Sequence, residues 1–230
     1  MGRVSTERRR MTWSKRAFDI GFTVFLAPAA LAVFGVIFIL QWWKQGRPFF
    51  YRSERMYKPG EPFALWKFRT MRNVVADTGV SGGDKSTRIT PFGRKLRRLR
   101  MDELPQFLNI LRGDISFVGP RPPLRQYVEQ FPDLYARVLR SRPGVTGLAS
   151  LVFARHEEEI LRDCATPDET DRVYARRCVA RKARIDLLYQ EHANLVLDLW
   201  IIALTVARSA GRARGRRLPR RRPAHHPSRL

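Results

Sequence analysis

The sequence IGFTVFLAPAALAVFGVIFIL, residues 20 to 40, decides the fold. It contains no charged residue and reaches the roughly 20 residues that are needed to cross the hydrocarbon of a membrane. Trp42 and Trp43 follow it at the level where an aromatic belt would lie. The simplest interpretation is a single straight transmembrane helix.

Two features of this run favour a different membrane element. Pro28 lies in its middle and removes a backbone donor, so a helix here is expected to kink. Both flanks are basic, with Lys15 before the run and Lys44 after it. Because positive charge prefers the cytoplasmic side, a spanning helix would leave one basic flank on the wrong face. We therefore predict a membrane-embedded, re-entrant helix hairpin over residues 15–45, kinked at Pro28.

Basic charge is concentrated at the two ends of the chain. Of the formal net charge of +23, residues 208–230 contribute +9 and residues 1–16 contribute +5. We predict a basic arm (1–14), a cytoplasmic catalytic domain (46–207) and a disordered arginine-rich tail (208–230). Such a surplus favours an anionic partner, which could be phospholipid, nucleotide or nucleic acid. The tail is expected to lie against anionic membrane lipids.

A small β-hairpin is predicted directly after the membrane element. Residues 48–56 and 62–71 are rich in aromatic and apolar side chains, and Pro59 and Gly60 between them are good turn residues. Alternation along the second strand puts Lys67 and Arg69 on one face, which is either a solvated face or a cationic wall. With helical patterns elsewhere, the predicted class is α+β, mostly helical, with amphipathic interfacial helices.

The stretch GRKLRRLRMDELPQFLNILRGDISFVGPRP, residues 93–122, holds the adjacent carboxylates Asp102 and Glu103 after a dense arginine cluster. Thr90-Pro91 opens a helix before it, and Gly113 is a natural helix stop. We expect a break near residues 100–102, which would leave both acids at the N-terminus of a second helix. Simple N-capping would explain one of the two carboxylates without any chemistry.

The rest of the chain carries weaker signals. Residues 73–88 are expected to form a polar, mobile loop, and residues 114–122 a tight connector. Residues 125–139 look helical, with a break at Phe131-Pro132. The run Leu195 to Ala207 is apolar apart from Asp198, and it is too short to span a membrane, so it is expected to be a core or interfacial helix.

These parts suit the transfer of a phosphate-linked group between a soluble nucleotide and a membrane lipid. Cations are needed to draw in phosphates, and carboxylates can hold Mg²⁺ or attack phosphorus. A lipid acceptor cannot leave the bilayer, so such a site must lie at the membrane interface. The candidate phosphate- or nucleotide-binding residues are Lys67, Arg69, Arg97, Arg121 and Arg142.

Six segments, in order, resemble the bacterial sugar transferases, which are small monotopic phosphoglycosyl transferases. The resemblance covers roughly residues 15–205. The segments are Lys15-Arg16-x-Phe18-Asp19, the apolar run with Pro28, Trp66-Lys67-Phe68-Arg69-Thr70-Met71, Met101-Asp102-Glu103-Leu104-Pro105-Gln106, Gly113-Asp114-Ile115-Ser116-Phe117-Val118-Gly119-Pro120-Arg121-Pro122 and Arg142-Pro143-Gly144-Val145-Thr146-Gly147.

The resemblance implies transfer of sugar-1-phosphate from a UDP-sugar to undecaprenyl phosphate, with release of UMP and a covalent aspartyl-phosphosugar intermediate. It implies that Asp102 is the nucleophile, that Glu103 assists the reaction, and that these two acids hold Mg²⁺. It also implies that Lys67, Arg97 and Arg121 bind phosphate. The expected location is the bacterial inner membrane, with the catalytic domain on the cytoplasmic face.

Two other classes of protein fit parts of the sequence. A membrane-tethered nucleic-acid binder would explain the charge but not Asp102 and Glu103, so no nucleic-acid partner is expected. A non-catalytic scaffold of a polysaccharide assembly complex would not explain why every expected catalytic position holds the expected residue. The sequence does not reveal the sugar or whether the product feeds capsule, exopolysaccharide or O-antigen, and it leaves a homodimer open.

Overall fold

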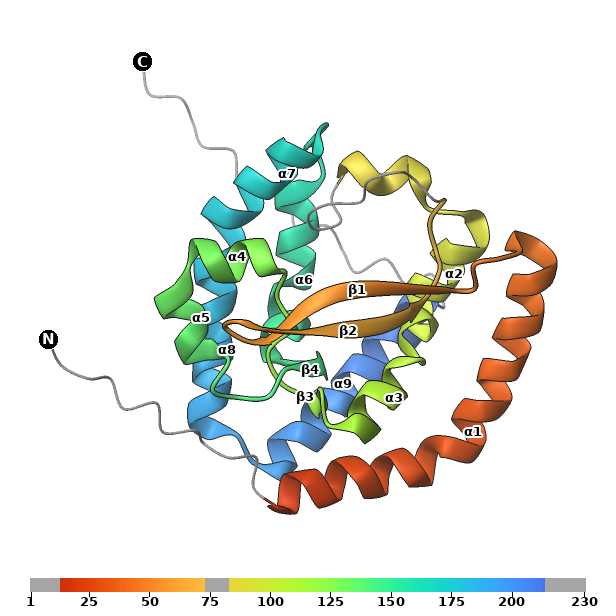
Figure 1. Cartoon of the computed structure of the whole chain (residues 1–230), viewed down its shortest axis with the longest axis horizontal. Helices are drawn as coiled ribbons and strands as arrows, with labels where there is room; N and C mark the ends of the chain where they lie inside the picture. Colours follow the sequence, from red (N-terminus) through yellow and green to blue (C-terminus); the bar gives the residue numbers. More distant parts are fainter. Residues whose placement is uncertain (1–12, 73–82, 214–230) are drawn as a thin grey trace, which may run out of the picture.

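A computed structural model describes residues 13–72 and 83–213 of the chain (Figure 1). The predictions for most of the basic arm, for residues 73–82 of the polar loop and for residues 214–230 of the tail lie outside these residues. The α-helices are α1 (Trp13–Gln45), α2 (Pro91–Leu99), α3 (Gln106–Arg112), α4 (Arg125–Gln130), α5 (Pro132–Val138), α6 (Leu148–Leu161), α7 (Pro167–Tyr174), α8 (Ala180–His192) and α9 (Leu195–Ala213). The predicted class, α+β and mostly helical, is confirmed.

Helix α1 contains the apolar run and continues through Pro28 without interruption. Figure 1 shows it running along one edge of the molecule and changing direction on its way. Among the described helices it alone is long and apolar enough to cross a membrane, and Phe25, for example, is 76% exposed. Length and composition do not distinguish a re-entrant helix from a spanning one, so the hairpin kinked at Pro28 stays a prediction.

The predicted β-hairpin is confirmed. Strands β1 (Phe50–Lys58) and β2 (Glu61–Phe68) are antiparallel, and the turn places Gly60 at a φ of +79°, a conformation that glycine adopts without strain. The hairpin crosses the middle of the molecule in Figure 1. Leu65 and Phe68 are buried, so β2 brings the residues between them close to the interior.

The predicted break in the helix that follows is also confirmed. The Thr90 hydroxyl accepts a hydrogen bond from the Gly93 amide at 2.9 Å and caps α2, which ends at Leu99. Arg100 adopts a left-handed conformation with φ of 57°, and the 3₁₀ turn η2 (Met101–Glu103) precedes α3. Gly113, with φ of 88°, ends α3 as expected.

The prediction of a plain connector over residues 114–122 was wrong. Strand β3 (Ser116–Val118) lies there and pairs in parallel with β4 (Gly144–Thr146). The pairing depends on glycine, because a Cβ at Gly119 would lie 2.2 Å from the Arg142 carbonyl oxygen. A strand of three residues is too short to show the alternation of apolar and polar residues by which a strand is predicted from sequence.

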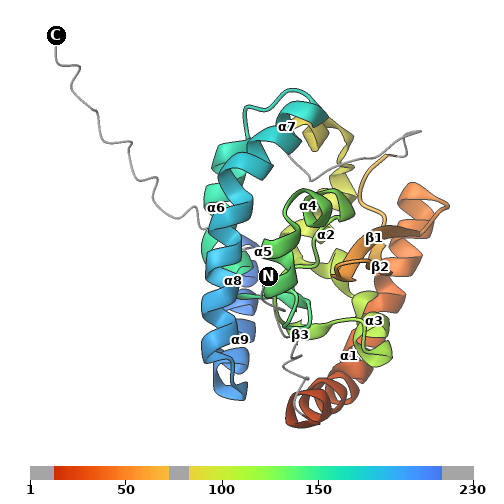
Figure 2. The same cartoon turned by 60° about the vertical axis from the view of Figure 1, so that its left-hand side comes forward.

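Helices α6, α8 and α9 form a wall on the side of the molecule opposite α1 (Figure 2). The five-residue π-helix η3 (Ala175–Val179) joins α7 to α8. Helix α9 continues to Ala213, so the first residues of the expected tail are helical, and Val196 and Trp200 lie exposed on it. The expected loop near residue 85 contains a 3₁₀ helix, η1 (Gly83–Arg88).

Candidate functional site

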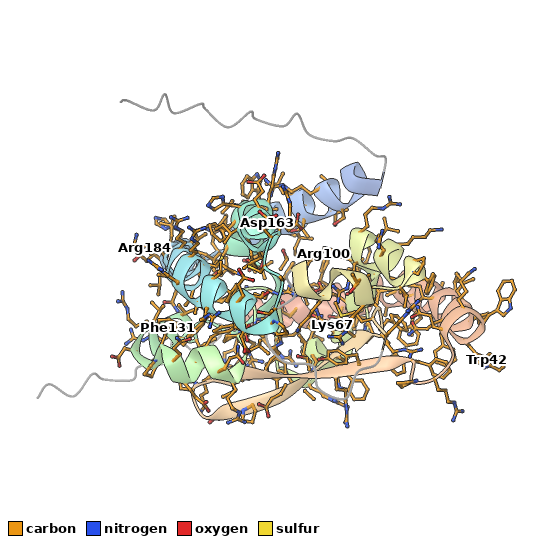
Figure 3. All side chains as sticks on the ribbon, turned by 90° about the horizontal axis from the view of Figure 1, so that it is seen from above. Trp42, Lys67, Arg100, Phe131, Asp163 and Arg184 are labelled. Atoms are coloured by element: carbon orange, nitrogen blue, oxygen red, sulfur yellow. The ribbon has the colours of Figure 1, made fainter. Side chains whose placement is uncertain are left out.

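The two adjacent acids lie in the turn η2, where the chain passes from α2 to α3. Arg100 reverses the chain just before them, so both side chains turn inward, and Asp102 is 7% exposed and Glu103 8%. Strand β2 packs against this turn and brings Lys67 to it. In the view from above, Lys67 and Arg100 lie near the centre of the molecule and Trp42 at its rim (Figure 3).

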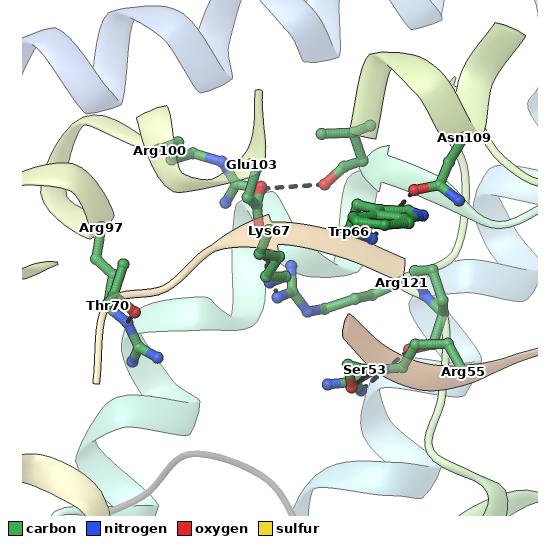
Figure 4. A network of polar contacts seen from close by, with 12 residues as sticks. Ser53, Arg55, Trp66, Lys67, Thr70, Arg97, Arg100, Glu103, Asn109 and Arg121 are labelled. Atoms are coloured by element: carbon green, nitrogen blue, oxygen red, sulfur yellow. Dashed lines mark hydrogen bonds and ion pairs between the residues drawn. The ribbon is translucent and has the colours of Figure 1, made fainter. Parts of the chain in front are cut away.

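Glu103 is held by three cations (Figure 4). Its Oε1 lies 3.2 Å from Lys67 Nζ and 3.5 Å from Arg121 Nη2, and its Oε2 lies 2.5 Å from Arg100 Nη2. Burial would raise the pKa of Glu103, but Lys67, Arg100 and Arg121 outweigh it and lower the pKa below its usual range. Burial also lowers the pKa of Lys67, to about 8, against the attraction of Glu103. The pair is therefore ionised at neutral pH.

Asp102 differs from its neighbour in having no fixed partner. Among residues 13–72 and 83–213, none makes a hydrogen bond or ion pair with its carboxylate. Burial and the charge of Glu103 raise the pKa of Asp102, while Lys67 and Arg97 oppose them. One carboxylate of the pair is thus a fixed, ionised anchor, and the other is open to an incoming group.

The other predicted cations lie at different distances from this pair. Arg97 donates its Nε–H to Thr70 Oγ1 at 2.8 Å and lines the same cavity. Arg69 also lines the cavity, but it donates to the carbonyl oxygens of residues 45 and 46 at 2.7 and 2.9 Å, where it fastens the end of α1. Arg142 lies over the Tyr57 ring at 5.4 Å and is not among the residues that line the cavity. The structure does not bring Arg142 to the carboxylates.

Sequence reasoning missed Arg100 and Arg55. Arg100 was one of several arginines in a cluster, and only its left-handed backbone explains why it, rather than a neighbour, reaches Glu103. Arg55 on β1 donates to the Ser53 hydroxyl at 3.1 Å and lines the cavity. Burial and the nearby Arg121 lower the pKa of Arg55 to about 10. No pattern in the sequence separates it from the other basic residues of β1.

The acids and cations line one end of a cavity of about 880 Å³. Such a volume is within the range of pockets that hold small-molecule ligands. Within the described parts of the chain, there is no group of three or more His, Cys, Asp or Glu side chains that could hold a metal ion. Because both Glu103 oxygens are taken by cations, Asp102 is the carboxylate with room for Mg²⁺. One carboxylate, with substrate phosphates and water, fits the way in which Mg²⁺ usually binds.

Known proteins resemble this chain over most of its length. A protein-family model described as "Bacterial sugar transferase" matches residues 10–212. The "Uncharacterized sugar transferase EpsL" of Bacillus subtilis (strain 168) is 33% identical over 196 residues, which are 84% of this chain and 86% of that protein.

Two further relatives carry substrates in their names. The "UDP-glucose:undecaprenyl-phosphate glucose-1-phosphate transferase" of Klebsiella pneumoniae is 36% identical over 163 residues, 69% of this chain and 32% of that protein. The "UDP-N-acetylgalactosamine-undecaprenyl-phosphate N-acetylgalactosaminephosphotransferase" of Aeromonas hydrophila is 31% identical over 198 residues, 84% of this chain and 42% of that protein. The chain therefore corresponds to less than half of each of these two longer proteins.

Proposed function

Because the chain belongs to the bacterial sugar transferase family and is a phosphoglycosyl transferase, we propose that it transfers sugar-1-phosphate from a UDP-sugar to undecaprenyl phosphate and releases UMP. The observation that carries the proposal is the unequal pair at η2. Glu103 is fixed by three cations, while Asp102 faces the same cationic cavity and forms no hydrogen bond or ion pair with any residue that the structure describes. The product would be the first membrane intermediate of exopolysaccharide, capsule or O-antigen synthesis.

In the first step the Asp102 carboxylate attacks the sugar-bearing phosphorus of the donor. A bond forms between an Asp102 oxygen and that phosphorus, and the bond from phosphorus to the bridging oxygen breaks, so UMP leaves with the electron pair. Lys67, Arg97 and Arg121 stabilise the charge that develops on the phosphate oxygens, because they line the cavity beside Asp102 before the substrate binds. Glu103 keeps two of these cations in position.

In the second step a phosphate oxygen of the polyprenyl acceptor attacks the same phosphorus. The bond to Asp102 breaks, the carboxylate is regenerated, and the sugar is left on a lipid diphosphate. Mg²⁺, held by Asp102 together with substrate phosphates, would neutralise charge on the diphosphate. Glu103 would join as a metal ligand only if it released one of its cations, so we assign it first to positioning.

A lipid acceptor requires that the cavity lie at the membrane, and the contacts of α1 support a re-entrant arrangement. Near its start, Lys15 pairs with Asp198 of α9 at 2.5 Å. Near its end, Gln41 donates to the Phe49 carbonyl oxygen at 2.7 Å. Because both ends are bound to the same globular domain, a straight span would have to break one set of contacts. We therefore propose that both ends of α1 lie on the cytoplasmic face of the inner membrane.

Purified full-length protein in lipid nanodiscs, given Mg²⁺, undecaprenyl phosphate and a panel of UDP-sugars, tests the reaction. We expect UMP release with at least one donor and its loss in Asp102→Asn. Asp133→Asn, the same change at an exposed position of α5, is the matched control and should keep full activity. Without acceptor, mass spectrometry should find a sugar-phosphate adduct on the peptide that contains Asp102. DNA binding without UMP release would favour the nucleic-acid binder instead.

The topology has its own test. Cysteines introduced at Ser14 and Lys44 report the two ends of α1, and the native Cys164 and Cys178 are buried, so background labelling should be low. A membrane-impermeant maleimide should label both introduced cysteines only when it has access to the cytoplasmic face. Labelling of the two positions from opposite faces would restore the straight span.

A further inference from the structure

The cavity continues past the cationic residues to the wall of helices, which the proposed chemistry does not use. We call this part the helical end. Beside apolar side chains such as Leu161 and Val179, its lining includes polar or small residues of α6, α7 and α8, namely Ser150, Ala154, Glu157, Tyr174, Lys182 and Asp186. Lys182 is 9% exposed and Asp186 7%, so two charged side chains are buried in this wall of the cavity in addition to the catalytic acids. Charged side chains are seldom buried unless they are paired, so their presence here calls for a structural or functional explanation.

One side of the helical end is a row on α6. Ser150, Ala154 and Glu157 are spaced at i, i+4 and i+7, so they share one face of the helix. The two ends of this row are polar, and the alanine between them leaves space. Glu157 Oε2 accepts a hydrogen bond from Lys182 Nζ at 2.7 Å, which joins this row to the facing helix.

The facing row depends on the π-helix η3. Each residue of an α-helix advances about 100°, so Tyr174 and Lys182, eight residues apart, would be offset by about 80° in a regular helix. A π segment accommodates one extra residue, which reduces this offset to about 20°. Lys182 Nζ accordingly donates to Tyr174 Oη at 3.1 Å. Asp186 follows Lys182 by four residues and continues the same face.

Asp186 is the member of this row that lacks a partner. Its Oδ1 is buried, and no described residue forms a hydrogen bond with it. The Ala149 amide at the start of α6 opposes the effect of burial on the pKa of this carboxyl group. Burial raises its pKa to about 7, so near neutral pH the group can either accept or donate a hydrogen bond. A buried oxygen without a hydrogen-bond partner in a cavity wall could be satisfied by a hydroxyl group of a ligand.

We infer that the helical end receives the glycosyl group of the donor and selects among sugars through Asp186, Lys182 and Ser150. This inference rests on the proposed function. The donor's phosphates belong at the cationic end, and the sugar is bonded to the phosphorus that Asp102 attacks, so it must lie in the adjoining space. A sugar presents hydroxyls that both donate and accept, and these two rows offer acceptors and donors close together. The small side chain of Ala154 leaves room for the ring.

The test compares donor use with nucleotide binding in the full-length protein. We measure kcat/KM for each UDP-sugar by UMP release, and the affinity for UDP, which has no sugar, by titration calorimetry. Asp186→Asn should lower kcat/KM for the preferred donor at least tenfold and change the order of preference, while the Kd for UDP stays within twofold. Ala154→Leu, which fills the space without removing a polar group, should act in the same direction. Ser150→Ala should have a smaller effect of the same kind.

Asp171→Asn is the matched control for Asp186→Asn. Asp171 also lies in this helical region and accepts a hydrogen bond from Tyr127 Oη at 2.6 Å, but it does not line the cavity. Equal loss of UDP affinity in Asp186→Asn would assign the helical end to the nucleoside and overturn the inference, and so would an unchanged donor preference. If the wild type released no UMP, the proposed function would fail separately. The ratio of UDP-sugar to UDP affinity, compared between wild type and Asp186→Asn, would then still decide the inference.

Discussion

Asp186 makes the stability of the protein depend on pH in a way that can be calculated. Burial raises the pKa of Asp186 from 3.8 to about 7. Because the folded state holds the proton more tightly, the stabilising effect of protonation is fully present below the unfolded pKa and is lost as pH rises through the folded one. The two pKa values are about three units apart, so the full effect is up to about 4 kcal/mol. Between pH 5 and pH 8 the free energy of unfolding should fall by about 2.5 kcal/mol from this group.

Asp186→Asn isolates this contribution, because asparagine keeps the shape and does not titrate. The groups that interact electrostatically with Asp186 (Lys182, Tyr135 and Tyr189) are unchanged in the variant. We expect the thermal midpoint of the wild type to fall between pH 5 and pH 8 by about 5–10 °C more than that of Asp186→Asn. The measurement is thermal unfolding of both proteins in one detergent, followed by circular dichroism. Parallel pH profiles for the two proteins would refute the reasoning.

Three further changes test other parts of the molecule. Glu103→Gln removes the charge that holds the site cations and should lower kcat for UMP release about 10²-fold or more, measured beside wild type at saturating donor. Lys15→Met leaves the 1%-exposed carboxylate of Asp198 without its ion pair and should lower the thermal midpoint by about 6–12 °C, since breaking a buried pair costs about 3 kcal/mol or more; a drop under 2 °C would contradict this. Gly119→Ala puts a Cβ 2.2 Å from a carbonyl oxygen of the facing loop and should reduce folded yield sharply. Gly35→Ala, with no atom within 4 Å, should not.

The parts that could be predicted from the sequence are those that local chemistry decides. Pro59 and Gly60 fix the hairpin turn, and Thr90 with Pro91 fixes the start of α2, because a few adjacent residues determine each conformation. Lys67 and Glu103 are 36 residues apart in the sequence. Their contact was expected only because the segments that contain them match motifs of one family. Nothing local in either segment brings the two together.

The parts that could not be predicted depend on geometry that leaves no periodic pattern of apolar residues in the sequence. Strands β3 and β4 are three residues each, and their parallel pairing joins segments that the sequence presents as separate rigid loops. Tyr174 and Lys182 are spaced so that a regular helix would put them on different faces, and only the π-helix aligns them. The helical end of the cavity was therefore not visible in the sequence. Residues 155–192 are charged, with mixed signs and a helical pattern, and carry no motif that indicates a site.

The balance of charge in the cavity explains why the two acids differ. Lys67, Arg97, Arg100 and Arg121 surround the two acids Asp102 and Glu103, so positive charge exceeds negative charge among these residues even when both acids are ionised. A diphosphate would neutralise much of that surplus, but its negative charge would also raise the pKa of Asp102 further. Attack requires the ionised form, so the cations must outweigh both Glu103 and the substrate. An enzyme that uses a carboxylate to attack an anionic phosphate therefore needs more positive charge than the substrate alone would require. Strand β2, the C-terminal end of α2 and the loop after β3 supply this charge.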